Sequence, residues 1–393
     1  MGVTWLLATC CFALGCSQQF IMGIPSDIAA SLGVSVAAVG QLMTAFSLAS
    51  AVGTPILLAG TSHKLTPRSQ MLLGLGLMVL GLIAFSFISN YVTLLAARVV
   101  MGVGNGTFTS TAMAIAATSA KPGHQASALS NVSLGFSAAM VLGMPIARTV
   151  APFIGWHALY GILSAVAVLI AFAIFKLVPN SGREMLTAEK PPTLKERFSP
   201  LANRTIVFAL VVMVLINLGF SSFYTYVTPF LENTFGTADH TVSMVLLISS
   251  LMSIVGIKGS GWLADHTGCK RTATAALCVQ ILSLSVLGAY HEVGIVVWVA
   301  MCVWVTSDWS FNPSQNLMLT RLAENNASLV LGLSGSALQL GSALGSAAGG
   351  IFIETAPVGF LPFLSVIAIF IALMIELFFV FRGMKPSIYS SQA

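Results

Sequence analysis

The stretch Gly261-Trp-Leu-Ala-Asp265-His-Thr-Gly268-Cys-Lys270-Arg271 gathers charges and glycines between two long apolar segments. Its glycines favour a tight turn, and Asp265 lies at the end of one apolar segment, close to the cations Lys270 and Arg271. The following segment, 272–291, carries no charge. It is long enough to cross a bilayer, because a transmembrane helix needs about 20 apolar residues. The pattern predicts a short turn between two membrane-spanning helices.

Charge-free segments of this kind recur along the whole chain. Of its 393 residues, 56% are hydrophobic and only 7% are charged, whereas soluble globular proteins carry roughly 25% charged residues. Asp, Glu, Lys and Arg are absent from 28–63, 69–97, 99–120, 122–147, 149–175, 205–231, 272–291, 325–353 and 355–375. A transmembrane β-barrel would instead show short segments of alternating polarity. The composition therefore predicts an all-α polytopic membrane protein.

The apolar segments predict twelve transmembrane helices. The first residues carry no basic region and no small-residue cleavage pattern, so 4–25 is expected to be a span and not a cleaved signal peptide. The predicted spans are 4–25, 37–59, 70–89, 92–116, 126–152, 157–178, 205–230, 241–263, 272–290, 294–319, 329–353 and 361–381. Twelve crossings place both ends of the chain on one side of the membrane.

The basic residues give these spans a direction. Of the 17 basic residues, Arg98, Arg148 and Lys258 fall within spans. All others lie on the side of the termini: Lys64, Arg68, Lys121, Lys176, Arg183, Lys190, Lys195, Arg197, Arg204, Lys270, Arg271, Arg321, Arg382 and Lys385. Because cytoplasmic loops are enriched in Lys and Arg, both termini are predicted to be cytoplasmic. The net charge of +5 follows from this orientation and requires no nucleic-acid partner.

The one long connection divides the chain into two halves. It covers 179–204 and contains several prolines and charges of both signs. We predict an N-terminal six-helix bundle over 1–178, a cytoplasmic linker over 179–204 and a C-terminal six-helix bundle over 205–393. Many transporters join two such bundles and bind their substrate near the membrane midplane between them.

Several motifs resemble those of the major facilitator superfamily. The segment 261–271 resembles the G-x-L-A-D-x-x-G-x-[KR]-[KR] loop of that family, and Arg98-Val-Val-Met-Gly102-Val-Gly104-Asn-Gly106 resembles its R-x-x-x-G-x-G-x-G helix. Gly143-Met-Pro145 and Gly155-Trp156-His157 are similar to segments of its drug:proton antiporter and arabinose-efflux-permease-like branch. The resemblance implies two six-helix bundles and alternating access driven by an ion gradient.

Three residues depart from the pattern of that branch. Gln18 stands where the branch commonly has an acid, and glutamine cannot carry a proton. His63 replaces the loop aspartate in the first half, and His157 replaces the arginine of the Gly-Trp-Arg segment. These departures argue against a proton path through the first span.

Polar side chains gather on four predicted spans, and the resemblance implies that these spans line a central cavity. On three of them the residues share one helix face, as their spacing shows. The candidate substrate-binding residues are Gln18, Gln19, Asn105, Thr109, Asn217, Ser221, Tyr224, Trp304, Asp308, Asn312 and Gln315. The alternative is that their hydrogen bonds only hold the helices together.

Asp308 and Arg98 are the candidate proton-coupling residues. Asp308 is the most central carboxyl group in any span, and charges there cost about 2.5–3.5 kcal/mol on insertion scales. Burial favours the neutral acid, which could then bind and release a proton near neutral pH. The alternative is an ionised or packing-locked aspartate. Arg98 keeps its charge, so it either tunes an acid, binds an anionic substrate or is a structural hydrogen-bond hub.

Charged residues and glycines near the ends of spans are candidate gating elements. Asp27 and Arg148 are expected to pair on the outer side, the alternative being that both reach water. The segment 261–271 is expected to act as a conformational latch on the cytoplasmic side. The candidate gating residues are Asp27, Arg148, Gly261, Asp265, Gly268, Lys270 and Arg271.

Two further expectations concern the last two spans. Gly341, Gly345 and Gly349 recur every four residues, which allows close helix approach, and they are expected to form a sliding seam between the halves. Glu376 is expected to reach the membrane interface or Arg382.

These features predict a secondary active transporter that works by alternating access. Proton-coupled efflux of a small organic solute, such as a drug or a sugar-like compound, is the first choice. Uptake by proton symport is the alternative, and a non-transporting membrane sensor of the same fold ranks behind both. The expected location is the bacterial plasma membrane. The expected partners are the substrate, protons and the lipid bilayer. No cofactor or metal is expected, and the proton gradient is the expected energy source.

An enzyme is disfavoured. Gly332-Leu-Ser334-Gly335 resembles the motif of rhomboid-type serine proteases, but that chemistry needs a later histidine as base, and the last histidine of the chain is His291. A His-Glu-x-x-His metal motif is also lacking. The six cysteines have no metal-like spacing and are expected to pack as small apolar residues.

Overall fold

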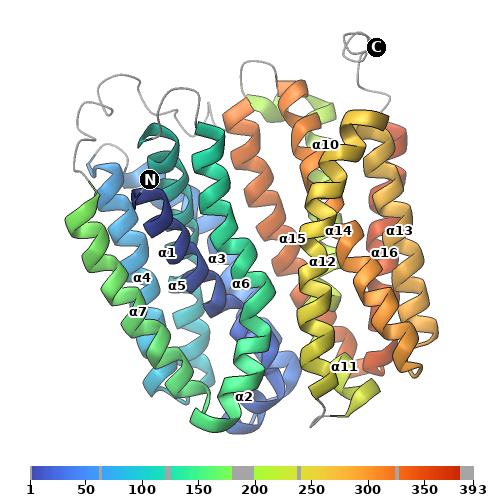
Figure 1. The fold of residues 1–393 in the computed structure, drawn as a ribbon, viewed down its shortest axis with the longest axis horizontal. Coiled ribbons are helices and arrows are strands. Elements are labelled where there is room, and N and C mark those ends of the chain that lie inside the picture. The colour runs from blue at the N-terminus through green and yellow to red at the C-terminus, as the bar shows by residue number, and fades with distance from the viewer. Residues whose placement is uncertain are drawn as a thin grey trace. The chain divides into compact units, whose positions relative to one another are not determined.

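Helices account for all the regular structure in the described part of the chain. The computed structural model describes residues 2–61, 64–119, 125–178, 199–236, 240–323 and 327–380, and these ranges contain no strand. The chain divides into two units, Met1–Thr193 and Leu194–Ala393. Figure 1 shows the course of the chain through the helices of each unit.

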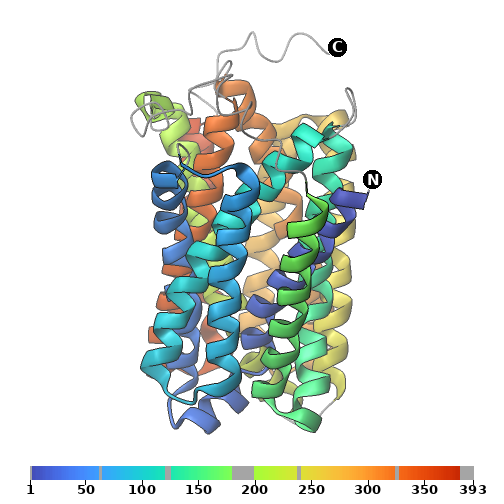
Figure 2. The same cartoon turned by 90° about the vertical axis from the view of Figure 1, so that its left-hand side faces the viewer.

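The first unit contains six long helices and one short helix among its described residues. They are α1 (Gly2–Gly23), α2 (Pro25–Leu32), α3 (Val36–Thr61), α4 (Pro67–Phe87), α5 (Tyr91–Ser119), α6 (Gln125–Ile154) and α7 (Trp156–Leu177). Glycines with a positive φ let the chain reverse at two ends of these helices, where Gly33 (φ 64°) follows α2 and Gly155 (φ 79°) precedes α7. In Figure 2 the long helices of this unit run side by side in roughly one direction.

The second unit also contains six long helices and one short helix among its described residues, together with three short helical turns. Its helices are α10 (Arg204–Tyr224), α11 (Val227–Phe235), α12 (His240–Thr267), α13 (Cys269–Ala289), α14 (Gly294–Ala323), α15 (Ala327–Thr355) and α16 (Leu361–Ile375). The 3₁₀ turns η2 (Ser199–Ala202) and η4 (Val358–Phe360) precede α10 and α16, and the π-helical turn η5 (Glu376–Val380) continues α16.

The surface of these helices suits a lipid environment. Eleven of the described helices are long and apolar enough to cross a membrane. The twelfth long helix is α5, which carries Arg98 and Asn105. Large apolar side chains face outward, and Phe87 and Phe153 are 82% and 84% exposed. Such exposure is unfavourable in water but not in hydrocarbon. The chain is therefore an all-α membrane protein with twelve transmembrane helices in two six-helix bundles.

Both units pair their helices in the same order. In the first unit α1 packs on α6, α3 and α4 both pack on α5, and α4 also packs on α7. In the second unit α10 packs on α15, α12 and α13 both pack on α14, and α13 also packs on α16. One packing plan is thus used twice along the chain.

Glycines create the closest helix contacts of this plan. In the first unit a Cβ atom added at Gly135 would overlap the carbonyl oxygen of Ala8, and one at Gly143 would lie 2.5 Å from Cβ of Gln19, so both glycines face α1. In the second unit Gly341, Gly345 and Gly349 bring α15 against the backbone of α10. The expectation that these three glycines form a seam between the halves is wrong, because they serve a contact within one half.

Proline breaks the first long helix of each unit. The predicted span 4–25 matches α1 to within two residues at each end, and α2 begins after it at Pro25. The predicted span 205–230 is instead divided, because α10 gives way to α11 at Thr225 and Tyr226. A proline ring clashes with the carbonyl group four residues earlier, which for Pro229 belongs to Thr225. The break is then stabilised by α15, since the Thr225 and Tyr226 hydroxyls bond to Ser346 at 2.8 and 3.0 Å.

Replacing Gly345 with alanine is expected to destabilise the second unit. The new Cβ would overlap the Leu218 carbonyl oxygen and lie 2.9 Å from the Ser222 backbone nitrogen. Neither atom can move without separating α10 from α15, and overpacking of this kind costs about 1–3 kcal/mol. Gly335→Ala on the same helix is the control, because its Cβ would meet nothing within 4 Å. The melting temperatures of the purified variants measure the difference, and equal values would contradict the expectation.

Candidate functional site

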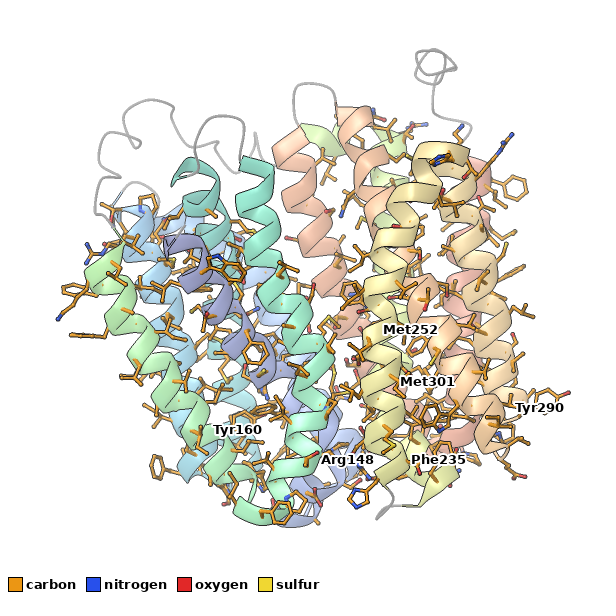
Figure 3. The ribbon with its side chains drawn as sticks, in the orientation of Figure 1. Arg148, Tyr160, Phe235, Met252, Tyr290 and Met301 are labelled. Atoms are coloured by element: carbon orange, nitrogen blue, oxygen red, sulfur yellow. The ribbon has the colours of Figure 1, made fainter. Side chains whose placement is uncertain are left out.

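Arg98 joins three helices in the interior of the first unit. It is completely buried on α5, and its Nη2 donates to the Ser17 carbonyl oxygen on α1 (3.1 Å) and to the Tyr160 hydroxyl on α7 (3.0 Å). The Tyr160 hydroxyl donates to the same Ser17 carbonyl at 3.1 Å. Tyr160 is labelled in Figure 3 among the helices of this unit. The arrangement fixes the guanidinium group through neutral partners.

Aromatic rings complete the surroundings of Arg98. Its Cζ lies 4.6 Å from the ring centroid of Phe85, 5.7 Å from that of Phe46 and 5.9 Å from that of Tyr160. Ring faces attract a desolvated cation. Nε and Nη1 of Arg98 have no hydrogen-bond partner within the described ranges. Arg98 is thus a firmly held cation with two unpartnered nitrogen atoms, which together carry three N–H groups.

The predicted substrate-binding residues of the first unit lie on α1 and α5, two of the three helices that meet at Arg98. Gln18 is half-buried and Gln19 is buried on α1, and the Gln19 Oε1 atom has no partner among the described residues. Asn105 is buried on α5, where the Thr109 hydroxyl donates to the Asn105 carbonyl oxygen at 2.8 Å. Their binding role stays a prediction.

Asp308 occupies the interior of the second unit. It lies on α14 with only 5% of its surface exposed. Tyr224 on α10 lies close enough to interact electrostatically with Asp308, and its hydroxyl is hydrogen-bonded to Ser250 on α12. No cation is paired with Asp308 in the described part of the chain. The alternative of an ionised aspartate with a basic neighbour therefore finds no support among these residues.

Trp304 lies one turn before Asp308 and is packed among aromatic rings. Its centroid is 5.4 Å from that of Phe220, 5.0 Å from that of Phe223 and 6.3 Å from that of Tyr224. It is fully buried, and its Nε1 atom has no partner among the described residues. The cluster fixes one side of α14 against α10 and leaves one indole N–H available.

The polar face of α10 makes hydrogen bonds to α15. The side-chain amide of Asn217 donates to the Leu338 carbonyl oxygen, and the Ser221 hydroxyl donates to that of Ser342 at 3.0 Å. These bonds match the alternative in which polar residues hold the bundle together. The Asn217 side chain is half-buried. Its predicted role in substrate binding stays a prediction.

Glu376 does not reach the membrane interface, which was one of its two expected positions, and Arg382, the other expected partner, lies outside the described residues. Glu376 is completely buried in η5, and the Gln315 side chain on α14 is hydrogen-bonded to it at 3.5 Å. The expectation failed because only the fold brings Gln315 opposite the last helix. Gln315 is itself fully buried and also donates to the Ala209 carbonyl oxygen at 3.4 Å.

The candidate gating residues are placed at helix ends. Asp27 is exposed in the first turn of α2, where an acid is favourable, and Arg148 is half-buried near the lower end of α6 in Figure 3. Each takes part in an interaction, and their pairing with each other stays a prediction.

The latch segment is described in part. Gly268 adopts φ 87° and separates α12 from α13, so the predicted glycine turn is present. Lys270 is half-buried and Arg271 is exposed in the first turn of α13. The side-chain surroundings of Gly261, Asp265 and Asn312 lie outside the described residues.

Sequence reasoning missed the partners that hold Arg98 and the buried state of Glu376. Ser17, Phe85 and Tyr160 lie far from Arg98 in the chain, and Ser17 contributes only a backbone carbonyl, which no side-chain pattern reports. For Tyr160 a signal was present, since an isolated tyrosine in an apolar span requires a hydrogen-bond partner.

The two bundles of long apolar helices with buried polar centres define a multi-pass membrane protein. Its family follows from comparison with known proteins: the sequence model of the Major Facilitator Superfamily matches residues 6–346. The chain belongs to this family, whose members transport small molecules across membranes.

Individual relatives agree with this assignment. The chain is 31% identical to the MFS-type transporter YbcL of Bacillus subtilis (strain 168) over 380 residues, 96% of each chain. It is 28% identical to the chloramphenicol resistance protein of Streptomyces lividans over 275 residues, 69% of each chain. Among solved structures it resembles the nucleoside transporter NupG, with a TM-score of 0.76 and 13% identity over 95% of this chain and 99% of that one. The last similarity concerns the fold alone.

Removing the Tyr160 hydroxyl is expected to destabilise the first unit more than removing an ordinary buried hydroxyl. Tyr160→Phe takes away a partner of the buried cation, and bonds to charged groups contribute about 1.5–3 kcal/mol against about 0.5–1.5 kcal/mol for neutral ones. Tyr91→Phe is the control, since it loses only a bond to the Ala38 carbonyl oxygen (2.9 Å). Thermal unfolding of both variants tests this, and a smaller effect for Tyr160→Phe would show that Arg98 does not depend on it.

Proposed function

We propose that this transporter exports a small organic solute, such as a drug or a sugar-like compound, in exchange for protons. Asp308 carries the proton, and Arg98 is a fixed cation that supports coupling. Alternating access exposes the site to each side of the membrane in turn. The transporter lies in the bacterial plasma membrane with both termini in the cytoplasm.

The burial of Asp308 without a paired cation is the observation that supports this proposal most directly. A carboxyl group in such surroundings is more stable as the neutral acid, because an isolated charge in a low-dielectric interior is costly. Hydration on opening the site would favour release of the proton. Tyr224 lies near enough to Asp308 to interact with it electrostatically.

Arg98 supplies a permanent positive charge in the first unit. Its two unpartnered nitrogen atoms, Nε and Nη1, can donate hydrogen bonds to an acceptor on a solute. Substrate binding is assigned to Gln18, Gln19, Asn105, Thr109, Asn217, Ser221, Tyr224, Trp304, Asp308, Asn312 and Gln315. This set combines amide, hydroxyl and aromatic groups, which suits a neutral or weakly cationic amphipathic compound.

The export direction draws support from the chloramphenicol resistance protein of Streptomyces lividans, because resistance to a drug is a natural consequence of its export.

Gating is assigned to the pair Asp27–Arg148 on the outer side. On the inner side it is assigned to the latch residues Gly261, Asp265, Gly268, Lys270 and Arg271.

Asp308→Asn is expected to uncouple transport from the proton gradient. In everted membrane vesicles with an acidic interior, the native protein should accumulate a solute from a panel of chloramphenicol and simple sugars. The variant should only equilibrate that solute, because asparagine keeps the shape of the side chain but cannot bind a proton. Radiolabelled solute inside the vesicles gives the measurement.

Glu292→Gln is the matched control, since it removes an exposed acid in the turn before α14 and should leave accumulation unchanged. Normal accumulation by Asp308→Asn would remove Asp308 from the proton path. Accumulation only in right-side-out vesicles with an acidic exterior would replace export with uptake by symport.

A further inference from the structure

Glu376 is a buried acid that the proposed exchange mechanism does not use. It opens the π-helical turn η5 directly after α16, and its surface is completely covered. Single π-helical turns are rare and are frequently found at functional sites. Here the turn directs a carboxyl group into the interior of the second unit, between α10 and α14.

The contact between Glu376 and Gln315 is incomplete as it stands. Nε2 of Gln315 donates to Oε2 of Glu376 at 3.5 Å and to the Ala209 carbonyl oxygen at 3.4 Å. The two remaining oxygens, Oε1 of Glu376 and Oε1 of Gln315, are both buried and have no partner among the described residues. Two acceptors on adjoining groups thus lack a donor.

One proton resolves both deficits. A carboxylic acid protonated at Oε1 gains an O–H donor, and the Oε1 atom of Gln315 can accept from it. The acid and the amide then exchange two hydrogen bonds, one in each direction. An ionised Glu376 would instead leave both oxygens unsatisfied in a buried site, which is unfavourable.

No charged group in the described surroundings replaces that proton. The elements near Glu376 are α10, α13, α14 and α16, and Gln315 is its one described hydrogen-bond partner. Lys270 and Arg271 border a cavity beside the neighbouring Leu377 but make no described contact with Glu376. The charged residues of these elements within the described side chains are Arg204, which is exposed, Lys270, Arg271 and Asp308.

We propose that Glu376 is a second proton-binding site and that its protonated form clamps η5 to α14 through Gln315. Loss of the proton removes the hydrogen bond donated by the acid, leaves two buried oxygens unsatisfied and so loosens this end of α14. Gln315 lies seven residues after Asp308, two turns along the same helix face and about 10 Å away. The state of Glu376 therefore acts on the helix that carries Asp308.

A role of this clamp in transport rests on the proposed function, whereas its protonation does not. If Asp308 carries the exchanged proton, Glu376 determines whether α14 is held or free on the side that the basic residues assign to the cytoplasm. Glu376→Gln keeps an amide that can both donate and accept, so it should mimic the clamped state and slow turnover at alkaline cytoplasmic pH.

Infrared spectroscopy of the purified protein in lipid tests the protonation directly. In mildly acidic buffer the native protein should show the C=O stretch of a protonated carboxyl group that Glu376→Gln lacks and Asp308→Asn retains. Gln315→Leu should keep this band but shift it to higher frequency, because the hydrogen bond to the amide is lost. Thermal unfolding confirms that each variant is folded.

An unchanged carboxylic-acid region in Glu376→Gln would overturn the proposal, as would an unshifted band in Gln315→Leu. If Glu376→Gln does not fold, the Gln315→Leu spectrum decides alone. A Glu376 band that is present while Asp308→Asn still pumps would refute the exchange mechanism and leave the second proton site standing.

Discussion

Every backbone polar group inside a lipid-embedded bundle must find its partner within the protein, because hydrocarbon offers none. Helices meet this requirement, and short hydroxyl side chains add hydrogen bonds between the helices. Ser221 reaches Ser342 at 3.0 Å, a distance that requires the backbones of α10 and α15 to lie very close. The glycines of α15 make that approach possible. The glycines therefore allow the close helix approach that the hydrogen bond between the two serines requires.

The same requirement explains why both units share one packing plan. Each unit begins with a long helix that proline ends, and a short helix follows. Each places that first helix against a glycine-bearing partner, α6 or α15. The break in the second unit is packed against α15, where the Tyr226 hydroxyl donates to the Ser346 carbonyl oxygen at 3.0 Å. Thr225 and Tyr226 are both buried, so protein surrounds the irregular backbone there.

The helices were predictable from the sequence, because charge-free runs of sufficient length have few alternatives in a membrane. The predicted and observed ends differ by only a few residues for most of them, as in α7 and α13. The break at Thr225 was not predicted, because proline is often tolerated inside membrane helices. Candidate polar residues such as Asp308 were also visible, but their partners were not. Glu376 illustrates the limit: its position in sequence indicated the interface, whereas the pairing of helices buries it beside Gln315.

The two units solve the burial of charge in opposite ways, and the difference follows from chemistry. A guanidinium group cannot discharge itself, so Arg98 is stabilised by a carbonyl oxygen, a hydroxyl group and ring faces. A carboxyl group can become neutral by taking up a proton, so Asp308 and Glu376 can be buried without a cation. A bundle that carries its interior charge as arginine has no means of exchanging protons at that position. A bundle that carries buried acids can bind and release protons when its hydration changes. In the proposed exchange mechanism, this difference in side chains assigns proton handling to the second unit.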